Sequence, residues 1–462
     1  MSATITVQNP YSEAEIATLP LQSAEEAERL LAQAYARYQN RKSWMPKHER
    51  IAVLKKLASL MEKNREKLLI DAISEGGKPY KDSVVEVDRA IQGVHIAIET
   101  LAHMGGHEIP MGLTAGSAGR MAYTLREPYG IIVSVSAFNH PLNLIVHQTV
   151  PAFAVGAPVI VKPALTTPLS CLNLVNLFRE AGAPEDYVSA IICENDVAQK
   201  LVTDRRVGYF SFIGSAKVGW YLRSQLAPGV RCALEHGGAA PVIIAPDYDI
   251  EKSVAPIAKG GFYHAGQVCV SVQRVYVPKE KAETFAQKLA EAGNQMIVGD
   301  SLDPKTDVGP LILPREVDRI HEWVQEAIQS GGKLISGGNK LPNNCYQTTV
   351  ILNPSDNAIL SKNEIFGPVV AVYGYETLDE AYHRANDVDY SFQSAVFTDQ
   401  LSTAMEAVHH LDAQTVLVND HTAFRVDWMP FGGSAVSGLG LGGIPYSMEE
   451  MTRPKMMVIK PN

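Results

Sequence analysis

The chain has 462 residues, of which 46% are hydrophobic and 20% charged, and its 41 lysines and arginines against 50 aspartates and glutamates give a formal net charge of −9. This length favours two or more domains, the composition is typical of globular proteins, and the lack of a basic run argues against a nucleic-acid partner. No apolar segment reaches the ~18 residues of a membrane span, and the first residues lack the basic and apolar regions of a signal peptide.

Helical patterns fill the first hundred residues. The segment Ser23–Glu26 has the form of a capping box and predicts a helix that runs to about Tyr38. Apolar residues from Ile51 to Leu60 recur at helical spacing, and the pattern continues from Val85 to Met104. We expect helices here and no catalytic residue.

From Gly130 onward, short apolar runs alternate with helical stretches. The runs are residues 130–135, 158–162, 187–193, 207–213 and 231–234, and the helical stretches are 142–155, 168–181 and 216–226. This alternation predicts a parallel sheet covered by helices, whose ligands bind beyond the carboxyl ends of the strands. Asn139, Lys162 and Gly214 each follow a strand closely, so we expect them to converge on one site.

The alternation restarts after Gly238. Strands are predicted at residues 242–245, 274–277, 333–335, 369–373, 394–397 and 415–418, and helices at 279–298, 314–330, 378–386 and 401–410. The fold class is therefore α/β with two parallel sheets, divided near residues 236–240. A cleft between the two parts is the expected active site.

Two segments carry a chemical signature. Residues 260–269 read GGFYHAGQVC and end on Cys269, while residues 234–238 read LEHGG and contain Glu235. A thiol and a carboxylate beside glycines suit nucleophilic catalysis with a general base, although a cysteine is more often a buried apolar residue and a strand-end glutamate a solvated charge. The apolar setting of Glu235 favours burial and a raised pKa.

These two segments are followed by Glu364-Ile365-Phe366-Gly367-Pro368, and in this order they resemble the aldehyde dehydrogenase superfamily, over about residues 128–452. The resemblance implies a dinucleotide-binding domain, a catalytic domain and a small oligomerisation flap, hence a homodimer or homotetramer. The implied ranges are 1–105 with 127–236 for the first, 237–445 for the second, and 106–126 with 446–462 for the flap.

In that family the cysteine attacks the aldehyde carbon, hydride leaves to the nicotinamide, and a base activates water against the resulting thioester, which implies these roles for Cys269 and Glu235. Asn139, in an aromatic-Asn-x-Pro turn, would form the oxyanion hole with the N–H of Cys269; the alternative is an ordinary turn asparagine. The other four cysteines are interpreted as structural, and without Cys-x-x-Cys spacing they favour a reducing compartment, by default the cytoplasm.

The resemblance also implies a dinucleotide site without a metal. Lys162 would reach the adenosine ribose, backbone N–H groups at Gly214 and Ser215 would take the pyrophosphate, Glu364 would hold the nicotinamide ribose, and Phe366 would lie beside the nicotinamide ring. Many members that prefer NAD have a glutamate where this chain has Leu165, so the cofactor is NAD or NADP.

Two further positions separate this chain from its relatives. His236 stands where the family usually has leucine. The histidine could change the cofactor pocket or the protonation of Glu235, or it could be a replacement without effect. Phe424-Arg425-Val426-Asp427 resembles the lactaldehyde and phosphonoacetaldehyde dehydrogenase branch, in which Arg425 could pair with an anionic substrate or, equally, with Asp427 or another carboxylate.

The expected function is oxidation of a small polar or anionic aldehyde to its acid. One alternative is a relative that passes the thioester to coenzyme A, which commonly lacks the base that Glu235 would supply. The other is a catalytically silent protein on the same fold, which the complete set of site residues argues against.

Overall fold

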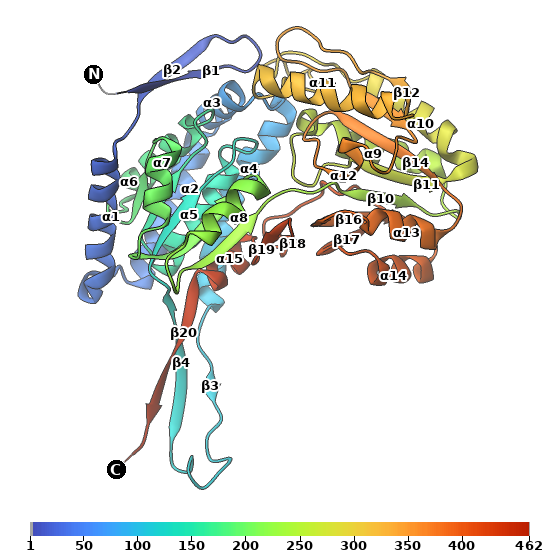
Figure 1. Cartoon of the computed structure of the whole chain (residues 1–462). Helices are drawn as coiled ribbons and strands as arrows, with labels where there is room; N and C mark the ends of the chain where they lie inside the picture. Colours follow the sequence, from blue (N-terminus) through green and yellow to red (C-terminus); the bar gives the residue numbers. More distant parts are fainter. Residues whose placement is uncertain (1–2, 462) are drawn as a thin grey trace.

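The computed structural model describes residues 3–461, which form two lobes and a projecting arm (Figure 1). A six-stranded sheet with the order β19-β9-β8-β5-β6-β7 lies in one lobe, and a seven-stranded sheet with the order β12-β13-β14-β11-β10-β16-β17 lies in the other. The arm is the three-stranded sheet β20-β4-β3. Within the described part of the chain, no helix has the length and apolar character that a membrane span requires.

The six-stranded sheet is parallel except at one edge. Its parallel strands are β5 (Ile131–Val135), β6 (Val159–Lys162), β7 (Val188–Ala190), β8 (Val207–Ile213) and β9 (Arg231–Glu235), and β19 (Gly438–Leu439) joins β9 antiparallel. The helices of this lobe are α1 (Ala24–Gln39), α2 (Lys47–Lys63), α3 (Arg65–Gly76), α4 (Tyr80–His103), α5 (Asn143–Val155), α6 (Leu169–Ala181), α7 (Asn195–Val202), α8 (Ala216–Ser224) and α15 (Ile444–Glu450). Every residue of α5 is buried, so this helix forms the centre of the lobe.

The seven-stranded sheet is parallel apart from β12. Its strands are β10 (Pro241–Ile244), β11 (Arg274–Pro278), β12 (Lys333–Ser336), β13 (Thr349–Leu352), β14 (Val369–Tyr375), β16 (Gln393–Phe397) and β17 (Thr415–Val418). The helices beside it are α9 (Ile250–Phe262), α10 (Lys279–Asn294), α11 (Pro314–Gln329), α12 (Ile359–Lys362), α13 (Leu378–Asn386) and α14 (Leu401–His410). The predicted α/β class with two parallel sheets is thus confirmed.

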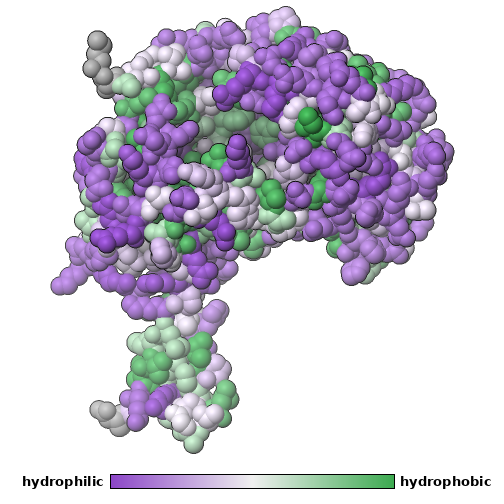
Figure 2. All heavy atoms as spheres, in the orientation of Figure 1, coloured by the Kyte–Doolittle hydropathy of each residue, from purple (hydrophilic) through white to green (hydrophobic). Residues whose placement is uncertain are grey.

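The remaining strands lie outside these two sheets. They are the hairpin β1 (Thr4–Gln8) and β2 (Glu15–Pro20), the short pair β15 (Tyr390–Ser391) and β18 (Ser434–Ala435), and the arm strands β3 (Glu108–Ile109), β4 (Met121–Pro128) and β20 (Thr452–Ile459). The arm carries exposed apolar side chains from both long strands, among them Leu125 and Met456, and Figure 2 shows apolar surface on it. The domain ranges predicted from the sequence stay predictions; β19, which they assign to the catalytic domain, pairs with the sheet of the other lobe.

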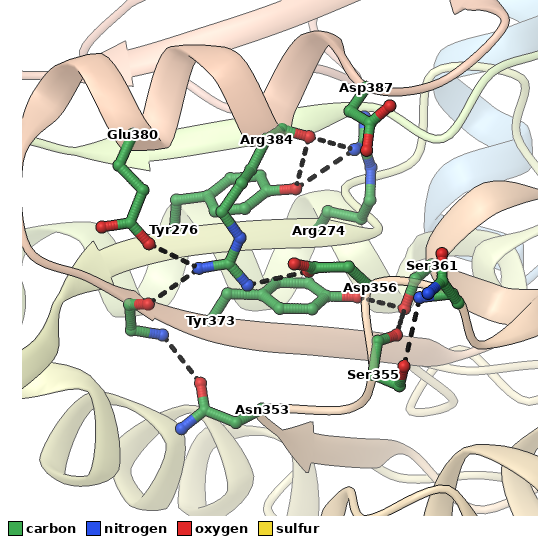
Figure 3. A network of polar contacts seen from close by, with 12 residues as sticks. Arg274, Tyr276, Asn353, Ser355, Asp356, Ser361, Tyr373, Glu380, Arg384 and Asp387 are labelled. Atoms are coloured by element: carbon green, nitrogen blue, oxygen red, sulfur yellow. Dashed lines mark hydrogen bonds and ion pairs between the residues drawn. The ribbon is translucent and has the colours of Figure 1, made fainter.

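A buried network fixes the connection between the sheets. Arg274 is 2% exposed, and its guanidinium donates to the carbonyls of Ala239 at 2.8 Å and Ala385 at 2.9 Å. Ala239 lies in the connection between β9 and β10, so Arg274 links this connection between the two sheets to the C-terminal end of α13. Figure 3 shows Arg384 alongside the stacked rings of Tyr276 and Tyr373, whose centroids are 5.1 Å apart.

Candidate active site

Four predicted residues stand at the carboxyl ends of neighbouring parallel strands. Lys162 ends β6, Glu235 ends β9, Asn139 follows β5 and Gly214 follows β8. The register pairs Val135 with Lys162 and Ile213 with Glu235, so these ends lie along one sheet edge. That Asn139, Lys162 and Gly214 converge on one site stays a prediction, and Figure 2 shows the surface hollowed where the two lobes meet.

Cys269 is brought to this edge from the other lobe by a tight turn after α9. His264, Ala265 and Gly266 all have left-handed backbone, with φ of 49°, 53° and 68°. A Cβ on Gly266 would lie 2.0 Å from the Gly367 carbonyl oxygen, so only glycine lets the turn pass this close to the segment after Phe366. The thiol of Cys269, which is unpaired and partly exposed, follows directly.

Asn139 is bonded to the same turn. Its Nδ2 donates to the Gln267 carbonyl at 2.9 Å, while the Gln267 side chain donates to Pro310 O at 3.2 Å and accepts from Ile312 N at 3.0 Å. A carboxamide has two N–H groups, so one remains for a second acceptor. Asn139 therefore links the first lobe to the turn that carries Cys269, and its second amide N–H is free to donate to another acceptor.

Asn139→Ala is expected to slow formation of the covalent adduct by ~10²–10³-fold, the usual cost of removing one oxyanion donor. The rate of the first burst of reduced cofactor, measured by stopped flow, checks this. The control is dinucleotide affinity, which should stay at the wild-type value. An unchanged burst rate would remove Asn139 from the oxyanion hole.

The charges at the site act on one another. Burial raises the pKa of Cys269 to about 12, Arg425 lowers it, and Glu364 and Glu235 raise it. Burial also raises the pKa of Glu235, again opposed by Arg425. These four side chains, from both lobes, thus share one electrostatic environment, in which the free thiol is neutral at physiological pH.

Glu235 is packed closely by glycine. A Cβ on Gly442 would lie 2.2 Å from Glu235 Oε1, and the β9–β19 pairing sets Gly438 opposite Glu235. The carboxyl group is therefore enclosed by the backbone of residues 438–442. Its environment agrees with the raised pKa expected from the sequence.

The residues predicted to hold a dinucleotide carry unsatisfied polar groups. Lys162 is 6% exposed, and its Nζ makes one long contact, 3.4 Å to the Pro163 carbonyl. Burial raises the pKa of Glu364 to about 8, and its Oε1 is buried without a partner. A buried ammonium group and a buried carboxyl oxygen that lack good hydrogen-bond partners could bind the hydroxyl groups of two riboses.

Glycine and aromatic residues complete this part of the site. A Cβ on Gly237 would lie 1.7 Å from Glu364 Oε1, so the glycine leaves room for the carboxyl group. Gly214 and Ser215 lead directly into α8, whose first N–H groups suit a phosphate. Phe366 meets Phe138 edge to face at 5.9 Å, beside Asn139.

Arg425 does not pair with Asp427, the alternative that the sequence left open. Asp427 is fully buried and is held by Arg89, at 2.7 and 3.0 Å, and by His147 Nε2 at 2.7 Å. The other nitrogen of His147 lies 3.4 Å from the Arg425 guanidinium, and Arg425 lies 3.5 Å over the ring of Phe431. Burial lowers the pKa of His147, so its neutral ring can accept from Arg425 and donate to Asp427.

The sequence did not reveal the residues that hold Asp427. Arg89 lies on α4, and Asn143 and His147 lie on α5, with Asn143 Nδ2 donating to Asp427 at 3.3 Å. The available signal was a row of polar residues in an otherwise apolar helix. Interpreting it required knowing that the whole of α5 is buried.

Comparisons with known proteins show the family of the chain and its fold. The sequence profile of the "Aldehyde dehydrogenase family" matches residues 1–457. A 3-sulfolactaldehyde dehydrogenase from Priestia aryabhattai is 35% identical over 98% of this chain and 94% of its own, and a lactaldehyde dehydrogenase from Methanocaldococcus jannaschii is 34% identical over 98% and 96%.

Solved structures are similar over the whole chain. Aldehyde dehydrogenase 21 from Physcomitrella patens, in complex with the reaction product succinate, has a TM-score of 0.95 at 32% identity, covering 99% of this chain and 95% of its own. Glyceraldehyde-3-phosphate dehydrogenase from Methanocaldococcus jannaschii, complexed with NADP, has a TM-score of 0.94 at 33% identity, covering 100% of each chain. The chain belongs to the aldehyde dehydrogenase family, whose enzymes are NAD(P)-dependent oxidoreductases acting on aldehydes.

Proposed function

We propose that this enzyme oxidises a small aldehyde bearing an anionic group to its carboxylic acid. The observation that carries the proposal is the unpaired charge of Arg425. Asp427 is satisfied by Arg89 and His147, and among residues 3–461 no carboxylate lies within ion-pair distance of Arg425, whose Nε is buried without a partner. A half-buried guanidinium with no ion-pair partner is unfavourable unless a ligand supplies a negative charge at contact distance.

Three of the similar proteins have names or ligands that fit an anionic substrate. 3-Sulfolactaldehyde, succinate and glyceraldehyde 3-phosphate carry a sulfonate, carboxylates and a phosphate, whereas lactaldehyde carries an uncharged hydroxyl group. A guanidinium can bind each of these anionic groups bidentately. Arg425 also acts on the pKa of Cys269, so an aldehyde held by its anionic end would have its carbonyl near the thiol only if it is short.

In the proposed reaction, the Cys269 thiol loses its proton to solvent, the thiolate attacks the aldehyde carbon, and the resulting oxyanion is held by Asn139 and the Cys269 N–H. The nicotinamide supplies the hydride acceptor when a dinucleotide is bound. Glu235 then takes a proton from water as it attacks the thioester, and the thiolate leaves. Lys162, Gly214, Ser215, Glu364 and Phe366 are the residues proposed to hold NAD or NADP.

Arg425→Leu is expected to raise KM for anionic aldehydes by about 10- to 100-fold, the usual value of a lost charge-assisted hydrogen bond. KM for propanal and hexanal should stay at the wild-type value, because these aldehydes offer no charge to the guanidinium. Steady-state kinetics with succinic semialdehyde, glyceraldehyde 3-phosphate and the two alkyl aldehydes checks this. Arg179→Leu is the matched control, because Arg179 lies on α6 and forms an exposed ion pair with Glu185.

A second role of Arg425 would give a different result. Its charge lowers the pKa of Glu235, so a role limited to that carboxyl would slow turnover of every aldehyde alike in Arg425→Leu. The acid limb of the pH profile would also move to higher pH. Equal losses for all aldehydes would contradict the substrate role.

We also propose a homo-oligomer in a reducing compartment such as the cytoplasm. The support for the first is the arm, whose two long strands expose apolar side chains without a covering layer. The support for the second is that all five cysteines are unpaired.

A further inference from the structure

His236, the residue after Glu235, is not used by the reaction described above. Its side chain is 3% exposed, and Nδ1 lies 2.9 Å from the Gly214 carbonyl oxygen. A carbonyl only accepts, so Nδ1 carries the proton and donates. Burial lowers the pKa of His236, so the ring is neutral and Nε2, buried without a partner, is unprotonated.

The imidazole fits a space that only glycine leaves open. A Cβ on Gly219, in α8, would lie 2.0 Å from His236 Cε1 and 2.7 Å from Nε2. Phe212 and Trp220 meet the ring edge to face at centroid distances of 5.7 and 6.0 Å. The ring is thus enclosed between the end of β8 and the helix that follows it, in one orientation.

Gly214 is consequently held at both of its polar groups by the end of β9. Its N–H donates to the Glu235 carbonyl at 3.1 Å, and its carbonyl accepts from His236. Ser215 follows as the N-cap of α8, and its side chain makes no capping hydrogen bond. The turn therefore depends on β9, and not on its own side chains, for its position.

We propose that His236 is a positioning residue that fixes the Gly214–Ser215 turn for the pyrophosphate of the dinucleotide. The leucine usual at this position could fill the space but could not donate to Gly214. A turn held in place before binding loses less conformational freedom on binding, which strengthens affinity. The inference rests on the proposed dinucleotide site, and it adds a residue that makes no contact with the reacting atoms.

Two substitutions separate the hydrogen bond from the packing. His236→Leu keeps an apolar side chain in the space but removes the donor, whereas His236→Asn is smaller and presents an amide N–H near the position of Nδ1. A packing role predicts that leucine is tolerated better than asparagine. The proposed role predicts the reverse order.

The measurement is calorimetric titration of the three proteins with ADP-ribose, which carries the pyrophosphate, and with adenosine, which has no phosphate. We expect His236→Leu to raise the Kd for ADP-ribose by about 3- to 10-fold, and His236→Asn to stay within about twofold of wild type. Affinity for adenosine should be the same in all three. Gly219→Ala, whose methyl carbon would displace the ring, should weaken ADP-ribose binding as His236→Leu does and provides a result if either of the other variants does not fold.

Three outcomes would overturn the inference. Equal ADP-ribose affinities in all variants would show that the bond to Gly214 is irrelevant to binding. Weaker binding by His236→Asn than by His236→Leu would assign the ring to packing. If the wild-type protein bound neither adenosine nor ADP-ribose, the proposed dinucleotide site itself would be contradicted. This result differs from the first two, in which the wild type binds ADP-ribose.

Discussion

Cys269→Ala is expected to abolish aldehyde oxidation, with turnover falling by ~10⁴-fold or more, as for other removed nucleophiles. The turn that carries Cys269 is fixed by Asn139 and by the close approach of Gly266 to Gly367, so loss of the thiol should leave the fold unchanged. Reduced-cofactor absorbance with a panel of aldehydes measures the loss. The thermal unfolding midpoint and the ADP-ribose affinity should match those of the wild type.

Cys232→Ala is the matched control, because Cys232 is also partly exposed but lies within β9. It should retain full activity. Since burial raises the pKa of Cys269 to about 12, iodoacetamide should label this thiol faster as the pH rises through the alkaline range. An active Cys269→Ala protein, together with first labelling at another cysteine, would assign the nucleophile elsewhere.

Glu235→Gln is expected to stop the enzyme after the first half-reaction, lowering steady-state turnover by ~10²–10⁴-fold, the usual contribution of a general base. The pre-steady-state burst of reduced cofactor should survive, because hydride transfer does not require activated water. Stopped-flow absorbance separates the two phases. Loss of burst and turnover to the same extent would point to a role in thiol activation or in structure.

The pH dependence tests the same residue. Because burial raises the pKa of Glu235 above that of an ordinary carboxyl, its base form is lost as the pH falls through this raised value. Turnover of the wild type should therefore have an acid limb above the usual carboxylate range, which Glu235→Gln lacks. Glu364→Gln is the contrasting variant, expected to weaken cofactor binding and to keep the limb.

Coenzyme A discriminates the remaining alternative for this half-reaction. If the thioester passes to coenzyme A, adding it should raise turnover of the wild type and restore turnover of Glu235→Gln. If water is the acceptor, coenzyme A should change neither.

The strands buried on both faces were the most predictable part of the fold. β5, β6 and β8 contain little but apolar residues, since each has helices on both sides, and their runs in the sequence gave their positions. α13 and α14 have the predicted bounds. Short, continuous apolar runs flanked by polar residues are sufficient for such elements.

The helix α9 was missed because its residues argue against a helix. Pro256 lies inside it, and Gly260 and Gly261 lie in its last turn, before Phe262. A Cβ on Gly261 would lie 2.5 Å from Val370 Cγ2, so these glycines permit close packing on the sheet. The left-handed backbone of the turn begins at His264 and Ala265, which are not glycines, so the sequence did not indicate where the turn starts.

The places of site residues along the sheet were predictable where these residues follow strands, and not where they depend on long-range pairing. Asn139, Lys162 and Gly214 were placed from strand ends, whereas their roles and that of Glu235 were implied by the family resemblance and stay predictions. The Arg89–Asp427 pair joins helix α4 to a loop far along the chain, and it shows that Asp427 has a partner other than Arg425, which the local sequence could not reveal.

The pairing of Gly438 with Glu235 joins two segments that are far apart in the chain and are therefore synthesised at different times. The ribosome completes β9 before it begins the seven-stranded sheet, yet the strand that closes this edge is made only after β17. Closing so long a loop is entropically unfavourable until the intervening sheet has folded and brought its ends together. A nascent chain that already contains both Cys269 and Glu235 therefore still lacks the backbone that packs against the carboxyl group of Glu235.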